Sequence, residues 1–267
     1  MHRLTTRSRG GIDARNGSGW LSPSLVLGLL CPLTILSFVV AVALAVTSYP
    51  TAFDMRLQWI SSLASAKRNP TGYFYMGAGL TTVAVLLIPL RRYLSGGPHA
   101  SPIARSAGAT LLLIGITALL LMGVETTVFP NYGRNRPIHR LLSLITLSSL
   151  TLGFVTLTVS RVRAMSGRRG PACLACAVLL APALGTALTG LLLHFSPDAA
   201  GWAVSRPARH TAPFFHTLPF WEWAAVSGLF AGGYLSAWAV TPRRASLAAI
   251  ATPRAAQDTA GGSPTPG

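Results

Sequence analysis

Six long runs of apolar residues, separated by shorter polar segments, dominate this chain. Each run is close to the ~20 residues that a helix needs to cross the hydrocarbon core of a bilayer. Inside lipid the backbone must satisfy its own hydrogen bonds, so these runs predict helices rather than open strands. The predicted helices cover approximately Leu25–Val46, Gly72–Leu90, Ala107–Val124, Leu141–Ser160, Cys173–His194 and Phe220–Val240.

The segments at the two ends of the chain are polar and set the predicted domain limits. Residues 1–20 are rich in Gly and Arg and predict a disordered basic N-terminus. Residues 243–267 are rich in Ala, Pro, Gly and Thr and predict a disordered tail. Residues 21–242 then form one transmembrane domain. The first run is long enough to span a bilayer, so we expect an uncleaved first helix.

The composition excludes the common soluble classes. Apolar residues make up 51% of the 267 residues and charged residues only 10%, whereas a soluble domain carries about 25% charged residues. Three cysteines are too few for a disulfide scaffold. The sequence therefore predicts an all-α, polytopic membrane protein, a bundle of six transmembrane helices.

The net charge of +16 is explained by membrane topology. In a soluble protein such a charge would suggest nucleic acid, but here the basic residues flank the apolar runs, and we expect no nucleic-acid partner. Fourteen of the 22 basic residues fall on the predicted side that holds both termini, and the other eight fall on the opposite side. The positive-inside rule then predicts cytoplasmic N and C termini. The excess of Arg over Lys, with abundant Ala, Gly and Pro, favours a bacterial plasma membrane.

Ionisable residues gather at the predicted outer ends of the helices. Glu125 ends the third helix, His139 opens the fourth, His194 ends the fifth and Glu222 starts the sixth. Ionisable groups at membrane depth are costly and usually face a bundle interior or a wet cavity. We therefore expect a shared extracytoplasmic polar pocket. The alternative is that each residue independently contacts water and lipid headgroups at the interface.

The loop after the first predicted helix has a helical period of its own. Apolar residues recur there every three or four positions, with a polar stripe beside them. This pattern predicts a short amphipathic helix in the membrane interface, whose polar stripe either roofs the pocket or faces water. Asp54 and Ser61 are therefore candidate binding residues, together with Glu125 and His139. The apolar stripe is Phe53, Leu57, Ile60 and Ala64, and the polar stripe is Asp54, Gln58, Ser61 and Ser65.

Short motifs in the first half of the chain resemble a bacterial membrane family. The motifs are Ile-Ser-Ser-Leu-Ala at 60–64, Asn-Pro at 69–70, Phe74, Gly-Ala-Gly-Leu at 77–80, and Phe-Pro at 129–130 followed by His139. Over residues 54–158 they resemble the six-helix family catalogued as domain of unknown function 998. That family is distantly similar to eukaryotic membrane proteins of the Frag1/DRAM/Sfk1 type.

The resemblance implies candidate positions but no biochemical activity. It marks Ser61, Pro130 and His139 as residues that match the family pattern. The family usually shows an acidic residue and then Leu-Gly after the serine, whereas this chain has Ser62 and Ala64 in those places. A role for the acidic position is therefore not carried over to this chain.

The outer carboxylates and histidines are also suited to acid–base chemistry. Glu125, His139, His194 and Glu222 are thus the candidate catalytic residues. A catalytic zinc needs three protein ligands and a water. His210 and His216, the weak candidates for metal ligands, are six residues apart in a loop that contains a proline, so they do not form a helical pair of ligands. We expect no metal site and no cofactor.

Three functions remain open from the sequence. The leading one is a non-catalytic protein, in contact with membrane lipids, that binds a lipid or a small amphiphile. The second is a membrane-embedded enzyme that acts on a lipid or isoprenoid substrate, and the third is an accessory subunit of a transporter. The absence of charge at mid-membrane argues against an ion-driven transporter itself. The sequence does not give the oligomeric state.

Overall fold

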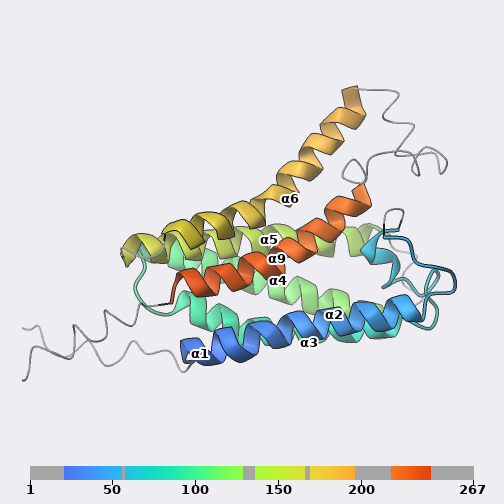
Figure 1. The fold of residues 1–267 in the computed structure, drawn as a ribbon, viewed down its shortest axis with the longest axis horizontal. Helices are drawn as coiled ribbons and strands as arrows, with labels where there is room; N and C mark the ends of the chain where they lie inside the picture. The colour runs from blue at the N-terminus through green and yellow to red at the C-terminus, as the bar shows by residue number, and fades with distance from the viewer. Residues whose placement is uncertain (1–20, 56–57, 129–135, 166–168, 196–217, 242–267) are drawn as a thin grey trace, which may run out of the picture.

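The structure, a computed structural model, describes residues 21–55, 58–128, 136–165, 169–195 and 218–241 (Figure 1). Over these residues the regular secondary structure is entirely helical, which confirms the all-α prediction. Each of the six apolar runs lies in a helix. The elements are α1 (Pro23–Leu25), the π-helical stretch η1 (Val26–Leu30), α2 (Cys31–Thr47), the 3-10 turn η2 (Ile60–Ser62), α3 (Tyr73–Ser95), α4 (Pro102–Val128), α5 (Arg136–Ala164), α6 (Arg169–Phe195) and α9 (Leu218–Ala239).

Five helical segments are long and apolar enough to cross a membrane, so the chain has the character of a multi-pass membrane protein. Several of their large apolar side chains point outward, as expected for helices surrounded by lipid. The five segments are Pro23–Thr47, Tyr73–Ser95, Pro102–Val128, Ile138–Ala164 and Arg169–Thr186.

The helices extend beyond the apolar runs because capping residues set where they begin and end. Ser22 accepts a hydrogen bond from the Leu25 N–H at 3.2 Å, and Pro23 occupies the first helical position. Ser101 plays the same part before α4, where its hydroxyl accepts from the Ala104 N–H at 3.4 Å. The predicted third helix is therefore only the apolar part of a longer one.

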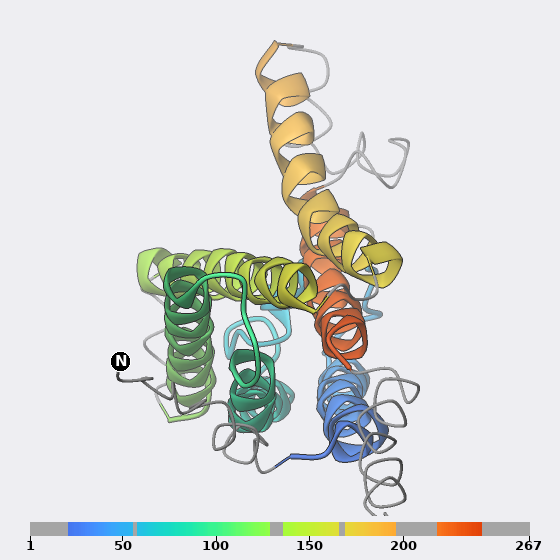
Figure 2. The same ribbon diagram turned by 90° about the vertical axis from the view of Figure 1, so that its left-hand side faces the viewer.

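Five of the long helices, α2, α3, α4, α5 and α9, enclose a common interior, and α6 lies at its edge (Figure 2). α4 packs against both α3 and α5, whereas α6 packs mainly on α9. Pro182 lies inside α6, and the part of the helix that follows leans away from the bundle in Figure 1. A proline inside a helix removes one backbone hydrogen bond and favours such a bend.

Glycines allow the closest approaches between helices. A Cβ atom on Gly115 of α4 would lie 2.7 Å from Cγ of Leu150 in α5, and one on Gly153 would lie 2.9 Å from the backbone N of Leu112. Gly228 of α9 similarly faces α6, where an added Cβ would lie 2.9 Å from a backbone oxygen. Small residues at these crossings let apolar helices pack by close van der Waals contact.

The loop between α2 and α3 differs from the predicted amphipathic helix. Among its described residues only Ile60–Ser62 forms a helical turn, of the 3-10 type. Three apolar members of the pattern, Phe53, Ile60 and Ala64, pack in or against the core, and Ile60 is 6% exposed. The buried Asn69 side chain donates to the carbonyls of Ala45 at 2.9 Å and Leu63 at 3.2 Å. Such side-chain bonds to the backbone favour compact turns over a continuous helix.

Candidate functional site

Two cavities meet at the end of the bundle that carries the α2–α3 loop. The first, here called the inner cavity, has a volume of about 110 Å³ and lies among the helices. The second, here called the vestibule, has a volume of about 490 Å³ and lies among the loop and the adjoining ends of α4, α5 and α9. Both volumes exceed the space that one water molecule needs.

The inner cavity is lined almost entirely by apolar side chains. All five enclosing helices contribute, and none of the described side chains of α6 does. A cavity with such walls favours an apolar occupant over water. Its apolar lining residues include Phe38, Met76, Leu80, Leu87, Met122, Leu147, Phe154, Val226 and Phe230.

The vestibule is polar and charged. Three basic side chains line it, Lys67 and Arg68 from the loop and Arg140 from the first turns of α5. Two acidic side chains, Glu125 and Glu222, line it as well. Arg68 is fixed in part by a hydrogen bond of 3.3 Å from its Nη1 to the Ser62 hydroxyl. The vestibule therefore presents more basic than acidic groups.

Five residues line both cavities, and we call them the junction. Four of them carry a polar side chain, so the passage between the two spaces is ringed by hydrogen-bonding groups. They come from the loop, from α5 and from α9, three segments far apart in the sequence. The junction consists of Ser61, Ala64, His139, Ser143 and Glu222.

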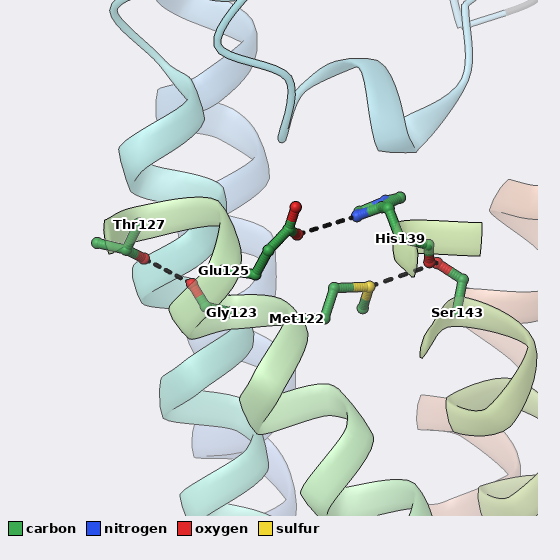
Figure 3. A network of polar contacts seen from close by, with 6 residues as sticks. All are labelled: Met122, Gly123, Glu125, Thr127, His139 and Ser143. Atoms are coloured by element: carbon green, nitrogen blue, oxygen red, sulfur yellow. Dashed lines mark hydrogen bonds and ion pairs between the residues drawn. The ribbon is translucent and has the colours of Figure 1, made fainter. Parts of the chain in front are cut away.

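Glu125 and His139 are paired across the site, as an ion pair whenever the imidazole is protonated. They point toward each other from the end of α4 and the start of α5 (Figure 3), and Nδ1 of His139 lies 3.5 Å from Oε2 of Glu125. The two side chains are 25% and 20% exposed for His139 and Glu125, respectively. Both side chains are partly buried, and the two atoms lie at the outer limit of hydrogen-bond distance, so the pair is a loose contact at the wall of the vestibule.

Ser143 stands one helical turn after His139 on the same face of α5. Its hydroxyl contacts the His139 carbonyl at 2.9 Å and the Met122 sulfur at 3.4 Å, as Figure 3 shows. The hydroxyl is thus engaged with the backbone rather than with the imidazole. It does not form the serine–base pair that nucleophilic catalysis requires.

Glu222 connects α9 to the loop. Its carboxylate faces the Ser61 hydroxyl and the backbone N–H groups of Ile60 and Ser61, at the start of the 3-10 turn. Next to it, Nε1 of Trp223 donates to the Gln58 carbonyl at 3.4 Å. The second carboxylate oxygen, Oε2, is buried and has no hydrogen-bond partner within the described residues. Glu222 therefore lies between α9 and the loop at the junction, with one carboxylate oxygen that has no partner among the described residues.

The other predicted site residues lie elsewhere. Asp54 is half-buried in the loop, where its carbonyl accepts from the Gln58 N–H at 2.9 Å, but it lines neither cavity. His194 lies in the last turn of α6, and its side chain falls outside the described residues. His210 and His216 also fall outside them. Within the described part of the chain no group of three or more metal-ligating residues occurs.

Sequence reasoning missed the basic side chains of the vestibule and Ser143. Lys67, Arg68 and Arg140 are among the eight basic residues that were used only to predict the topology. Each of them is close in sequence to a candidate residue. Arg140 follows His139 directly, and Ser143 is four positions after it, on the same helix face. That spacing was the available signal for Ser143.

The site combines an apolar chamber, a ring of hydrogen-bonding groups and a charged entrance. This arrangement is able to hold a molecule with an apolar and a polar end. Comparison of the chain with protein-family models, with curated proteins and with solved structures gave no match.

Proposed function

We propose that this protein binds a lipid or a small amphiphile at the extracytoplasmic end of a six-helix bundle in a bacterial plasma membrane. One observation carries the proposal: an apolar cavity inside the helices and a charged vestibule share five lining residues, four of them polar. Ligand sites are concave, mostly apolar and supplied with a few convergent polar groups. The apolar space suits a hydrocarbon chain, and the vestibule suits a polar head.

The proposal counts α9 as the sixth crossing. From Ala224 to Ala239 this helix has no charged residue, and it packs against α2, α5 and α6. Glu222 and two tryptophans occupy its first turns and lower its hydropathy there. Tryptophan is typical of the membrane interface. Six crossings put both termini on one side, and the distribution of arginines favours the cytoplasm for that side.

Membership in the family of domain of unknown function 998 is part of the same proposal. Two of the three residues that match its pattern, Ser61 and His139, belong to the junction. This shared location supports a common binding role for them.

Lipid analysis of the purified full-length chain tests the binding function. After extraction in a mild detergent, we expect mass spectrometry to find an amphiphile in stoichiometric amount. Val226→Trp fills the inner cavity, because Val226 lines it, and should lose the amphiphile. Val85→Trp is the matched control, since Val85 is 52% exposed on the outer surface of α3.

The outcomes separate the functions that remained open. Absence of any stoichiometric amphiphile from the unmodified protein, or equal retention by both tryptophan variants, contradicts the proposal. The unmodified protein could instead convert the added amphiphile to a new product, and His139→Ala could lose this activity. That result would favour the alternative of an enzyme with the Glu125–His139 pair as its acid–base group.

A further inference from the structure

We propose that the ligand is a single-chain amphiphile in which a hydrogen-bond donor separates the hydrocarbon chain from an anionic group. This inference rests on the proposed function and specifies the chemistry of the same site. It follows from the order in which apolar, hydrogen-bonding and basic groups occur along the two connected cavities.

The inner cavity accounts for the single chain. Its volume of about 110 Å³ is small, and its lining runs along α5 from His139 to Phe154. These sixteen residues of helix extend over about 22 Å. A long space of so small a volume accepts one hydrocarbon chain more readily than two.

The vestibule accounts for the anionic group. Lys67, Arg68 and Arg140 line the vestibule but not the inner cavity, so positive charge is confined to the entrance. Of the two acids that line the vestibule, Glu125 is paired with His139. Charge-assisted hydrogen bonds from Arg and Lys are the usual means of holding phosphate or carboxylate.

Glu222 accounts for the hydrogen-bond donor. It belongs to the junction, between the apolar chamber and the basic entrance, and its Oε2 is buried without a partner in the described part of the chain. A carboxylate accepts hydrogen bonds, and a buried acceptor left unsatisfied is costly. A hydroxyl or amide N–H placed between the chain and the anion would lie at the level of this carboxylate.

The test compares one parent lipid with three probes that each lack part of it. They are 1-dodecanoyl-glycerol 3-phosphate, its 2-O-methyl ether, 1-dodecanoyl-glycerol and inorganic phosphate. Binding is measured with the full-length chain in phosphatidylcholine nanodiscs. We expect the first probe to bind most tightly. The ether, which lacks the donor, and the monoacylglycerol, which lacks the anion, should each bind about tenfold more weakly, as expected for one lost hydrogen bond to a charged group.

Variants assign the anionic contact to the vestibule. The triple variant K67Q/R68Q/R140Q should reduce binding of the phosphate-bearing probe to the level of 1-dodecanoyl-glycerol while leaving the latter unchanged. The matched control is R105Q/R163Q/R169Q, which removes three exposed arginines at the other end of the bundle. The control should bind all four probes as the unmodified protein does.

The failure of this inference is distinguishable from failure of the proposed function. Equal binding of the three lipid probes overturns the inference and leaves amphiphile binding intact. Binding of inorganic phosphate as tight as that of the lipid phosphate also overturns it, because the site would then be an anion site without a role for the chain. If no probe binds and no amphiphile co-purifies, both the inference and the proposed function are wrong.

Discussion

Arg161 is a buried cation at the end of the bundle opposite to the vestibule. It is only 7% exposed, and its Nη1 donates to the Tyr93 carbonyl at 2.7 Å. Its guanidinium also lies 5.3 Å from the centroid of the Tyr93 ring. Because Tyr93 is in the last turn of α3, the positive charge meets the negative end of a helix dipole. Arg161 thereby fastens α5 to the end of α3.

The surroundings of Arg161 affect the neighbouring histidine. Burial, followed by the positive charges of Arg161 and Arg105, lowers the pKa of His99 in the α3–α4 loop. His99 therefore stays neutral at neutral pH and adds no charge beside the buried guanidinium. Gly97, two residues before His99, has a φ of 75°, a conformation that glycine adopts without strain. This conformation places the loop against Arg161.

Replacement of Arg161 tests this fastening. Arg161→Leu should lower the free energy of unfolding by about 2 kcal/mol, because a charged hydrogen bond and a cation–π contact are lost. Denaturant unfolding of the full-length chain in detergent micelles measures the change. Arg163→Leu is the matched control, since Arg163 is exposed two residues away. Equal destabilisation by the two substitutions would show that Arg161 has no special structural role.

At the scale of elements, the contact between α4 and α5 depends on glycine. Gly115 faces Leu150, and Gly108 faces Leu157, so one leucine of α5 packs over each of these two glycines of α4. Gly153 of α5 receives Leu112 of α4 in the same manner. This reciprocal packing brings the two backbones close together. It also sets the distance between Glu125 and His139, which lie at the end of the same helix pair.

Adding one methyl group tests this packing. Gly115→Ala should lower the free energy of unfolding by about 2 kcal/mol, because the new Cβ would lie 2.7 Å from a side-chain atom and 3.0 Å from a backbone atom of Leu150. Thermal unfolding in detergent micelles measures the loss. Gly28→Ala should leave stability unchanged or slightly raised, since nothing lies within 4 Å of its Cβ position. A harmless Gly115→Ala would contradict the tight crossing.

The sequence predicted the elements better than it predicted their ends or the site. Helices follow from the apolar runs, because lipid leaves the backbone no other hydrogen-bonding choice. The loop before α3 was wrongly predicted as a helix, because the spacing of Ile60 and Ala64 does not reveal that Asn69 closes the loop by bonds to Ala45 and Leu63.

Prediction of the site was limited by tertiary packing. The end-of-helix positions of Glu125 and His139 were sufficient to suggest that they lie in one layer, and the structure places them 3.5 Å apart. In contrast, the joint lining of the vestibule by Lys67 and Arg140 depends on how the loop folds over α5. No local pattern encodes that arrangement.

At the scale of the whole molecule, the orientation in the membrane is the prediction with the widest reach. A reporter that is active only outside the cytoplasm should be active when fused after residues 65, 133 or 205, and inactive after residues 97 or 166. The physical reason is the excess of basic residues on the side of the termini. Inactive fusions at the first three positions would place the vestibule in the cytoplasm and reverse the topology.

The lining of the inner cavity ends before the helices do. Its lining stops near Leu87 and Phe154, and beyond them Leu94 and Leu157 are 0% exposed. Under the proposed binding function, an amphiphile that enters by way of the vestibule would meet these buried leucine side chains before it reached the opposite face. Its occupancy would then follow its concentration in the leaflet that borders the vestibule.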